Sequence, residues 1–430
     1  MPDLSRRAMI GSSLASAAFA AGARAAQTAP SDRIRIGMVG CGGISVADSN
    51  AFLAHPESEI AVICDVDDGR IAATAGRLEK LRGRSPATVK DFRRVVERKD
   101  IDVCLICTPD HWHALPAVAA FEAGKDVYVE KPLATSIEEG RIVRDAAGKH
   151  ARIAQMGTQW RSGEHYREAV EMVQSGKIGK VRQVRCTAYL DWITDCGNPP
   201  DAPPPPGVDY DMWLGPAPVR PFNKNRFHFN FRWFWDYAGG LMTDWGVHLI
   251  NLALWAMGPE WPKSVVSSGG KYVLSDNTET PDTQITVYDF HSYTLIWEHQ
   301  VQCGLGPDRR EHGVAFTGTD ATLILDSKGW EIIAEPKKRT SVVEMKRAAN
   351  VDEKVRANHM RNFLDCVRSR KPPVENLDVG HHVSAVSHLG NVALRSRSRI
   401  EWDAAAGRVM ANEEAQALVT RPYRAPWKLA

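Results

Sequence analysis

An aspartate and a histidine four residues apart have the spacing of an acid–base pair. Asp244 and His248 follow Gly239 and Gly240, which supply a turn into a predicted helix running to Met257. Side chains at this spacing share one face of a helix. A histidine titrates near neutrality and can take a hydroxyl proton, while a carboxylate one turn away can orient it and stabilise its cation. The alternative interpretation is a local helix pair with no catalytic role.

A glycine cluster between a predicted strand at 34–39 and a predicted helix at 44–54 is the second chemical feature. Gly40 can take the sharp turn off the strand, and Gly42 lets a pyrophosphate approach the backbone because it has no Cβ atom. The helix then directs its N–H groups at the anion. The third small position is Ser45 rather than glycine, and a simple turn beside a buried strand is the alternative. The predicted pyrophosphate-binding residues are Gly40, Gly42, Gly43 and Ile44.

The acidic residue expected at the ribose is Asp65, which ends a second predicted strand at 60–65. It follows the glycines by roughly 20 residues, where the adenosine hydroxyls arrive in a dinucleotide-binding unit. A carboxylate accepts hydrogen bonds from a diol and repels a 2′-phosphate, so the sequence favours NAD. Arg70 leaves NADP as an alternative, and Asp67 can cap the next helix.

Strands and helices alternate from Ile34 to about Met156. This order predicts a doubly wound, mostly parallel sheet, whose ligands bind beyond the carboxyl ends of the strands. Cys104 and Cys107 lie in a buried-strand pattern and are predicted to be small apolar filler. The predicted strands are 34–39, 60–65, 101–107, 126–130 and 152–156, and the predicted helices are 44–54, 68–81, 89–97, 113–123 and 136–148.

Two of these strand ends carry polar motifs, Thr108–His113 (TPDHWH) and Glu130–Pro132 (EKP). Together with the glycine turn and Asp65, they resemble the family of sugar and inositol dehydrogenases typified by glucose-fructose oxidoreductase, inositol 2-dehydrogenase and MocA. The EKP triplet after a strand is the most specific part. The resemblance covers essentially the whole mature chain and implies a Rossmann domain, a nicotinamide cofactor and a carbohydrate or polyol substrate.

The resemblance also implies roles for single residues. Lys131 would contact the nicotinamide ribose and the reacting hydroxyl, and burial beside positive charge can lower the pKa of such a lysine so that it assists proton removal. His248 would be the general base or acid, with Asp244 as its partner and as a substrate contact. The nicotinamide half would meet Thr108, Pro109, His113, Glu130, Lys131 and Gln159, and the substrate would also meet Arg161, Tyr189 and Asp236. No metal site is predicted.

The chain beyond Met156 predicts a second domain, residues 157–430, after a first domain at 31–156. A helix at 164–175 precedes alternating strands that make an α+β domain with an open, mainly antiparallel sheet. The family resemblance implies a homo-oligomer formed through this sheet. The remaining predicted elements are strands at 181–189, 265–272, 284–290, 293–300, 313–317 and 321–326, helices at 359–368 and 378–397, and an anchoring tail at 423–427.

Residues 191–236 form a proline- and aromatic-rich insertion in this domain. Its proline run at 203–206 cannot lie inside a sheet, so a long loop is predicted. Aromatic faces stack well on pyranose rings, and the charged side chains between them can bind hydroxyls. A covering flap or an oligomer contact is the alternative, because such surfaces also favour tryptophan and arginine. These charged and polar residues are Arg220, Lys224, Arg226, His228, Arg232 and Asp236.

Residues 1–30 resemble a twin-arginine export signal and linker. Arg6 and Arg7 precede a weakly apolar stretch at 11–23, which is too short and mild to span a bilayer, and a small-x-small cleavage site follows at 23–25. The alternative is a disordered basic tail. The signal predicts a periplasmic protein, folded and loaded with NAD before export, in which the cofactor stays bound and is regenerated within each cycle.

The charge balance and the cysteines limit the classes of partner and the covalent links that this chain can have. With 54 basic and 52 acidic residues, the chain is near neutral, which argues against nucleic acid or an anionic membrane as the main partner. Cys186 and Cys196 can pair after export, and the sequence does not decide whether they do. The redox readings are a sugar oxidoreductase, a glycoside 3-dehydrogenase with an external acceptor, or an NAD-dependent glycosidase acting through a 3-keto intermediate. A non-catalytic sugar-binding relative is the alternative of another class.

Overall fold

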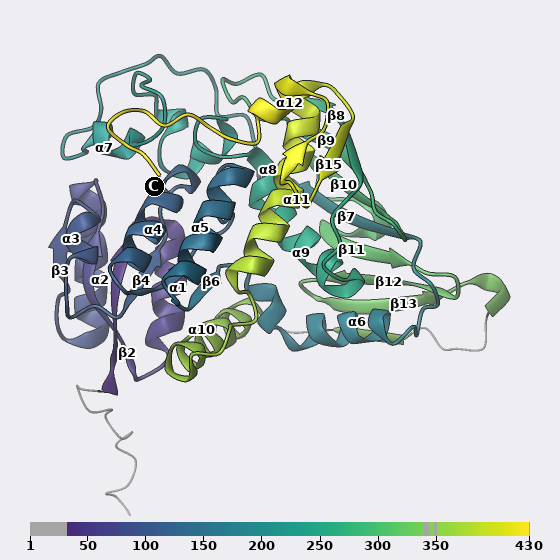
Figure 1. The fold of residues 1–430 in the computed structure, drawn as a ribbon, viewed down its shortest axis with the longest axis horizontal. Coiled ribbons are helices and arrows are strands. Elements are labelled where there is room, and N and C mark those ends of the chain that lie inside the picture. The colour runs from purple at the N-terminus through teal and green to yellow at the C-terminus, as the bar shows by residue number, and fades with distance from the viewer. Residues whose placement is uncertain (1–31, 339–343, 348–350, 430) are drawn as a thin grey trace, which may run out of the picture.

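A computed structural model describes residues 32–338, 344–347 and 351–429, so the predicted leader lies outside the described residues. The chain forms two sheets with helices between them (Figure 1). The first is a six-stranded parallel sheet of order β3-β2-β1-β4-β5-β6. Its strands are β1 (Ile34–Val39), β2 (Ser58–Cys64), β3 (Ala87–Val89), β4 (Val103–Ile106), β5 (Asp126–Val129) and β6 (Ala154–Met156). The predicted doubly wound sheet is confirmed.

The helices of this domain agree with the sequence except at one place. The predicted helix at 89–97 is wrong in extent, because Val89 pairs with Cys64 at the edge of the sheet and only Arg93–Val96 is helical. Asp67 caps α2 by accepting hydrogen bonds from the next turn, as predicted. The helices are α1 (Gly43–Leu53), α2 (Asp68–Arg82), α3 (Arg93–Val96), α4 (Ala114–Glu122) and α5 (Ile137–Lys149).

The second sheet has ten strands in the order β14-β13-β12-β11-β7-β10-β9-β8-β15-β16. Only the pair β7–β10 is parallel, so the predicted open, mainly antiparallel sheet is confirmed. The four strands that come last in the chain were not predicted from the sequence. The strands are β7 (Gln183–Leu190), β8 (Ser264–Gly270), β9 (Thr283–Asp289), β10 (Thr294–Val301), β11 (His312–Thr317), β12 (Ala321–Asp326), β13 (Gly329–Ala334), β14 (Glu344–Arg347), β15 (Ile400–Asp403) and β16 (Arg408–Val409).

Helices from the end of the chain join the two domains (Figure 1). Helix α10 (Val351–Ser369) packs on α1, where Arg356 pairs with the fully buried Asp48 at 2.6 Å. Helix α11 (Leu377–Ser396) packs against both α5 and β8. The other helices of this domain are α6 (Glu164–Gln174), α7 (Tyr210–Leu214), α8 (Gly240–Asp244), α9 (Gly246–Met257) and α12 (Glu413–Ala417).

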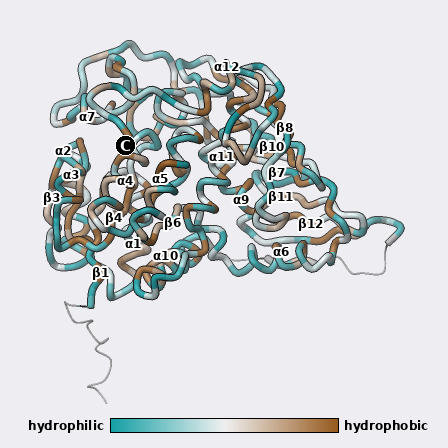
Figure 2. The backbone as a smooth tube through the Cα atoms, viewed as in Figure 1, coloured by the Kyte–Doolittle hydropathy of each residue, from teal (hydrophilic) through white to brown (hydrophobic). Residues whose placement is uncertain are grey.

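Hydrophobic residues are concentrated in the sheets and in the helices that pack on them (Figure 2). They run along α9 and the strands, whereas many outer loops are hydrophilic (Figure 2). Cys104 is buried and free, as predicted for apolar filler, whereas the buried, free thiol of Cys107 donates to Asp48 Oδ2 at 3.5 Å. None of the helices in the described part of the chain is long and apolar enough to cross a membrane.

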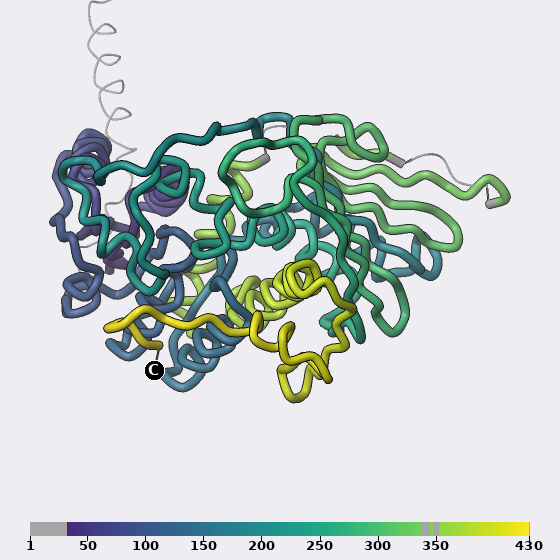
Figure 3. Tube along the Cα trace, turned by 90° about the horizontal axis from the view of Figure 1, so that it is seen from above, coloured from purple at the N-terminus to yellow at the C-terminus, as the bar shows by residue number. Residues whose placement is uncertain are grey.

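Part of the insertion, residues 205–232, reaches back over the first domain and is called the covering segment below. Seen from above, the teal chain crosses to the purple and blue domain (Figure 3). The N–H of Asp68 donates to the carbonyl of Gly207, and the N–H of Asp209 donates to the carbonyl of Val66. Val208 forms a β-bridge with Asp67. The insertion therefore includes a flap, one of the two interpretations from the sequence.

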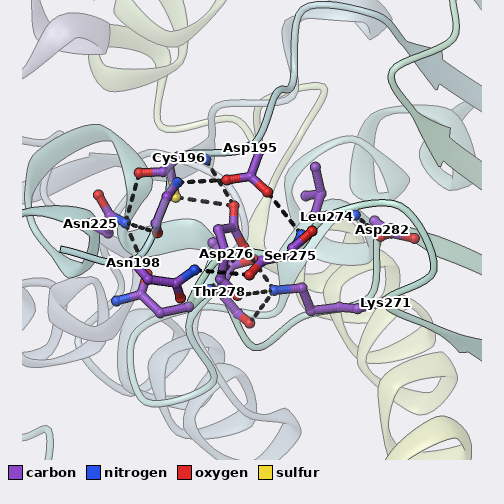
Figure 4. A network of polar contacts seen from close by, with 12 residues as sticks. Asp195, Cys196, Asn198, Asn225, Lys271, Leu274, Ser275, Asp276, Thr278 and Asp282 are labelled. Carbon is purple, nitrogen blue, oxygen red and sulfur yellow. Dashed lines mark hydrogen bonds and ion pairs between the residues drawn. The ribbon is translucent and has the colours of Figure 1, made fainter.

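The start of the insertion is tied to the loop after β8 (Figure 4). The Asp276 carboxylate accepts hydrogen bonds from the N–H of Cys196 at 3.0 Å, Nζ of Lys271 at 2.7 Å and the N–H of Thr278 at 3.1 Å. The Cys196 thiol donates to the same carboxylate at 3.2 Å, while Cys186 is buried in β7. Both cysteines are therefore free thiols in this structure.

Candidate active site

A cavity of about 360 Å³ lies beyond the carboxyl ends of the parallel strands. Ligands of doubly wound sheets bind at this edge. Residues of both domains line the cavity, since the covering segment and the end of α8 contribute to its wall. The predicted site residues in the lining are Gly40, Gly42, Gly43, Ile44, Asp65, Arg70, Thr108, Pro109, Glu130, Lys131 and Asp244.

Backbone geometry shapes the glycine end of the cavity. Gly40 has φ +94°, and a Cβ atom there would lie 2.6 Å from the carbonyl carbon of Cys107. Gly42 precedes α1 and caps it without a side-chain hydrogen bond, so the first N–H groups of the helix remain open to an anion. A Cβ atom on Gly42 would lie 3.1 Å from the Arg70 guanidinium. The turn thus leaves room for a phosphate beside a cation.

The Asp65 carboxylate is fixed beside this turn. It accepts hydrogen bonds from the N–H of Cys41 at 2.7 Å and the N–H of Asp67 at 3.0 Å. Burial raises the pKa of Asp65, and these two N–H groups oppose that effect. The predicted ribose-binding acid therefore lines the cavity in a defined orientation.

A polar contact from the covering segment closes the same end. His228 Nε2 lies 3.0 Å from Asp67 Oδ2 and 3.2 Å from Arg70 Nε. Burial and the charge of Arg70 lower the pKa of His228 to about 4, so the imidazole is neutral at pH 7. A residue of the second domain therefore contacts Asp67 and Arg70, which follow the predicted ribose-binding residue Asp65 in the chain.

A lysine, an aspartate and an arginine meet at the opposite end. Lys131 Nζ donates to Asp244 Oδ1 at 2.5 Å and to the Asp244 main-chain carbonyl at 3.1 Å. Arg232 Nε lies 3.5 Å from the same carboxylate oxygen. Burial alone would raise the pKa of Asp244, but the charges of Lys131 and Arg232 outweigh it and lower this pKa. Asp244 is therefore a carboxylate held by two cations.

The predicted helix that carries Asp244 and His248 is interrupted, which corrects the expected pairing. Helix α8 ends at Asp244 and α9 begins at Gly246. The His248 N–H donates to the carbonyl of Trp245, and the Asp244 carbonyl accepts from Lys131 Nζ. The Asp244 side chain pairs with Lys131 and Arg232, and no hydrogen bond joins it to His248 among the described residues.

His248 lies outside the cavity lining. Its ring centroid is 4.9 Å from that of Trp160, and its buried Nδ1 atom has no hydrogen-bond partner. Burial, followed by the charge of Lys131, lowers the pKa of His248 well below its ordinary value. The imidazole is thus neutral, packs on Trp160 and lies close enough to Lys131 to feel its charge.

The side chain of Glu130 contacts the main chain of Lys131. It is buried near the fully buried Asp48, and burial together with the Asp48 charge raises the pKa of Glu130. Arg356 of α10 binds Asp48 at 2.6 Å and balances the two carboxyl groups. The Lys131 N–H donates to Glu130 Oε2 at 3.3 Å. A helix distant in sequence therefore fixes the loop that presents the lysine.

His113 lies behind the cavity wall and joins its two strand-end loops. Its Nδ1 atom is 2.6 Å from the carbonyl of Pro132, and its Nε2 atom is 3.0 Å from the carbonyl of Thr108. Burial lowers the pKa of His113 to about 4, so it does not change charge near neutrality. This geometry supports a positioning function for His113.

Four other predicted site residues do not line the cavity. Arg161 pairs with the fully buried Glu375 at 2.9 Å, and Asp236 pairs with Arg220 at 2.9 Å. The Tyr189 hydroxyl donates to Glu298 on the outer sheet. Gln159 is buried next to the domain junction, with an unpartnered Oε1 atom. Side chains of these types can bind a polar ligand, but at least three of the four bind other side chains of the protein in this structure.

The cavity fits a dinucleotide on several observations. The glycine turn leaves a cradle that a Cβ atom would fill, and Asp65 stands at the ribose position. At the nicotinamide end, the buried Thr108 Oγ1 and Glu130 Oε1 atoms have no hydrogen-bond partner within the protein. Buried polar atoms of this kind need a partner, which a nicotinamide ribose or carboxamide can supply. Within the described ranges, no group of three or more His, Cys, Asp and Glu side chains could hold a metal ion.

Sequence reasoning missed several residues that line the cavity. Asp110 lies inside the TPDHWH motif, so its position after β4 was a usable signal. The covering segment gave a weaker signal, because nothing in its sequence indicates which of its side chains turn toward the first domain. Of its contributions, Met212 was not predicted, whereas the others belong to the aromatic and charged residues that the sequence offered for sugar binding: Trp213, His228, Phe229, Phe231 and Arg232.

Two family models match the chain. Residues 34–158 match "Oxidoreductase family, NAD-binding Rossmann fold", and residues 167–268 and 317–429 match "Oxidoreductase family, C-terminal alpha/beta domain". The solved structure of a levoglucosan dehydrogenase in complex with NADH and levoglucosan is similar with a TM-score of 0.68 and 18% identity, covering 86% of this chain and 99% of that one. At this identity the likeness shows the fold.

Curated relatives cover different shares of the chain. The uncharacterized oxidoreductase YrbE of Bacillus subtilis is 26% identical over 300 residues, or 69% of this chain and 74% of its own. Levoglucosan dehydrogenase of Pseudarthrobacter phenanthrenivorans is 30% identical over 173 residues, 39% of this chain and 43% of its own. An alpha-N-acetylgalactosaminidase of Shewanella oneidensis is 28% identical over 152 residues, 34% of this chain and 33% of its own. The last two are matched over less than half of their length.

Proposed function

The chain belongs to the Gfo/Idh/MocA family of oxidoreductases, and we propose that it transfers hydride between NAD and an alcohol carbon of a sugar, polyol or glycoside. The observation that carries this proposal is the contact between Lys131 and Asp244. It brings an ammonium of the first domain and a carboxylate of the second together at one end of a cavity that fits a dinucleotide. When bound, NAD supplies the hydride acceptor. The protein orients the alcohol and handles its proton.

Lys131 is suited to hold the oxygen of the reacting carbon. An ammonium group has three donors, and Asp244 accepts from Lys131 Nζ twice. The third hydrogen is left for a substrate hydroxyl or carbonyl oxygen. Arg232 shares the negative charge of Asp244, so Lys131 is not fully neutralised by its partner. A positively charged donor at this point stabilises the oxygen as it gains negative character.

NAD is the proposed cofactor because Asp65 is fixed in the cavity and would repel a 2′-phosphate. The Arg70 guanidinium lies beside the glycine turn, but it also contacts His228 of the covering segment. Its distance from Gly42 suits a pyrophosphate contact. Comparing the dissociation constants of NADH and NADPH tests this, with tighter NADH binding expected. Equal affinities would contradict the assignment.

We also propose that the cofactor stays bound through the catalytic cycle. The covering segment is joined to the first domain along its length. Besides its main-chain contacts, the carbonyl of Trp213 accepts hydrogen bonds at 2.9 Å from His111 Nε2 and from Trp112 Nε1. A ligand beneath a segment fastened in this way leaves only when several hydrogen bonds break. Mass spectrometry of the purified, denatured protein should detect NAD without any having been added.

Export to the periplasm would explain why the cofactor has to stay bound. The twin-arginine signal predicted from residues 1–30 would carry a folded protein to the periplasm, where no free NAD pool is expected. A retained cofactor would then be reoxidised by a second sugar or an external acceptor. Cell fractionation tests the location, and a cytoplasmic protein would remove this argument without affecting the site.

A redox-neutral glycosidase is the second candidate. The similarity to an alpha-N-acetylgalactosaminidase favours it, as does a fastened covering segment, because such chemistry needs no cofactor exchange. Release of nitrophenol from a nitrophenyl glycoside without added NAD would select this reaction, provided that Lys131→Ala abolishes it. Sugar oxidation without nitrophenol release would select the dehydrogenase. A sugar-binding protein without activity would show neither, and no NAD on purification.

The outer face of the ten-stranded sheet supports the proposed homo-oligomer. The strand register places four exposed apolar side chains on it, Val266, Ile285, Ile333 and Met345. They form two pairs, on β8 and β9 and on β13 and β14, and exposed apolar side chains gathered on a sheet face are typical of a contact surface. Light scattering during gel filtration measures the mass of the particle, and Ile285→Arg should reduce it. A monomeric wild-type protein would contradict this proposal alone.

A further inference from the structure

The aromatic side chains of the insertion, residues 191–236, differ in what they contact. Most of them are buried and pack in the core of the second domain. The ring of Trp235 is half-buried, and the Arg395 guanidinium lies over it at 4.9 Å. Among the aromatic residues of the insertion, all of which the structure describes, only Trp192 and Phe229 are exposed, by 44% and 58%. The buried ones are Trp213, Phe222, Phe227, Phe231, Trp233 and Phe234.

The two exposed rings contact each other. Their centroids are 6.2 Å apart and their planes meet at 66°. Trp192 follows the end of β7, whereas Phe229 lies in a short 3-10 helix, His228–Trp233, so two separate stretches of the insertion bring the rings together. Exposed apolar side chains that gather in this way are typical of a ligand-binding surface, whereas isolated ones are common on any protein. The rings form a corner in which a flat ligand ring can pack.

The turn before Phe229 is held in an unfavourable conformation. His228 has φ +52°, in the left-handed region, which costs about 1–2 kcal/mol for a residue other than glycine. Its side chain contacts Asp67 at 3.0 Å and Arg70 at 3.2 Å, and these contacts fix it. Backbone strain of this kind clusters at ligand sites, where the surrounding structure maintains it. The fold therefore maintains a strained residue directly before an exposed aromatic ring.

The exposed pair is continuous with the lysine end of the cavity. Phe229 itself lines the cavity. The Arg232 guanidinium lies 4.3 Å over the Phe229 ring, and Arg232 Nε is 3.5 Å from the Asp244 carboxylate that binds Lys131. Contacts therefore lead from Lys131 outward through Asp244 and Arg232 to Phe229 and then to Trp192. The corner stands beside the place where the reacting alcohol is proposed to bind.

Polar side chains flank both rings. Asp191 precedes Trp192 and is exposed, and Asn230 follows Phe229 and is half-buried. Neither side chain has a hydrogen bond or ion pair within the part of the chain that the structure describes. A carboxylate accepts hydrogen bonds, and an amide both donates and accepts them. A sugar ring matches this arrangement, because its faces carry C–H groups and its edge carries hydroxyls.

We propose that Trp192 and Phe229 form a subsite for a second sugar ring, joined by a glycosidic bond to the ring that is oxidised. The substrate is then a disaccharide or a longer glycoside rather than a free sugar or polyol. This proposal rests on the proposed oxidoreductase function and names its substrate class. The reacting ring lies at Lys131, and the second ring extends past Arg232 to the exposed aromatic pair.

The direct test compares substrates with the same linkage on the full chain with NAD added. The pairs are methyl α- and β-glucoside with maltose and cellobiose, and methyl α- and β-galactoside with melibiose and lactose. In wild type, kcat/KM should be about tenfold or more higher for the disaccharide of the preferred pair, since two aromatic rings contact its second sugar. Trp192→Ala should reduce this ratio to about threefold or less, whereas Trp192→Phe should keep most of it.

The matched control is Leu81→Ala, which truncates an equally exposed apolar side chain on α2 and should keep the whole ratio. A second readout does not need turnover. Saturation-transfer NMR should show contact between the protein and the reducing-end ring of the bound disaccharide, and Trp192→Ala and Phe229→Ala should each weaken it. Turnover without this contact would contradict the subsite alone, whereas contact without turnover would contradict the proposed function alone.

Three results would overturn the subsite. In the first, wild type uses the methyl glycoside and the disaccharide equally in every pair. In the second, both Trp192→Ala and Phe229→Ala keep the wild-type ratio. In the third, light scattering shows that Trp192→Ala lowers the mass of the particle, which would make the aromatic pair a contact between two copies of the chain. Should one alanine variant fail to fold, the other decides.

Discussion

The two ends of the cavity are built from different kinds of contact. At the glycine end, the shape depends on main-chain geometry: the positive φ of Gly40, the open N-terminus of α1, and the N–H groups that bind Asp65. At the lysine end, charged side chains of two domains meet. Lys131 comes from the first domain, and Asp244 with Arg232 comes from the second.

Because of this difference, we expect the glycine end mainly to bind the cofactor and the lysine end mainly to carry out the reaction. Main-chain contacts form as soon as the first domain folds, so the glycine end can hold a cofactor in one defined place. The lysine end forms only when the two domains are joined, because Asp244, the partner of Lys131, lies in the second domain, more than a hundred residues later in the chain. Substitutions at the two ends should therefore affect different measurements.

The largest expected effect is at the lysine end. Lys131→Met keeps the length of the side chain but removes the charge between Asp244 and the substrate oxygen, so turnover should fall by about 1,000-fold or more. NADH affinity, measured by fluorescence titration, should fall by no more than about 100-fold, since one charge-assisted hydrogen bond contributes about 1.5–3 kcal/mol. Lys149→Met, at an exposed position of α5, is the control. A loss of binding as large as the loss of turnover would erase the distinction between the ends.

The next effect concerns the junction that joins them. Arg161→Met leaves Glu375, which has no exposed surface, without its cation, so the free energy of unfolding should fall by about 3 kcal/mol. Urea unfolding measures this, with Arg167→Met on α6 as an exposed control. If Arg161 instead binds substrate, as the family resemblance implied, the variant would keep its stability and its KM would rise.

The sequence predicted the glycine end well because its signals are local. A strand, a tight turn and an acid at fixed spacing are read within about 30 residues, and Asp65 and Gly40 lie where such a unit places them. The lysine end was predicted only in part. The EKP motif located Lys131, but its partner depends on how α8 meets the first domain. The expected single helix through Asp244 and His248 was wrong, because the helix is interrupted at Trp245 between the two residues.

Gly40→Ala tests the glycine end directly. Alanine at φ +94° would place its Cβ atom 2.6 Å from the Cys107 backbone, so both strain and a backbone shift are expected. We expect NADH affinity to fall by about tenfold, equivalent to ~1.4 kcal/mol. Gly148→Ala is a matched control, since nothing lies within 4 Å of a Cβ atom there and this residue of α5 is outside the cavity lining. Equal losses in both variants would show that backbone shape does not control binding.

The smallest expected effect asks whether side chains matter at the glycine end too. His228→Ala removes the contact of the covering segment with Asp67 and Arg70, while the main-chain contacts at Gly207 and Asp209 remain. Because those contacts persist, NADH release should accelerate only a few-fold, the effect of roughly one hydrogen bond. Stopped-flow displacement by excess NAD measures the rate, and Lys224→Ala, an exposed position of the same segment, is the control.

The pH dependence of this release distinguishes a side-chain contact from a main-chain one. Burial lowers the pKa of His228 to about 4 in the closed structure, below the ordinary histidine value of about 6.5. A group with a lower pKa in the closed state favours closure most above pH ~6.5, and this contribution is lost as the pH falls toward 4. Release should therefore accelerate at acid pH in wild type and less so in His228→Ala. An identical acceleration in both would mean that main-chain contacts alone close the glycine end, leaving charged side chains decisive only where Lys131 meets Asp244.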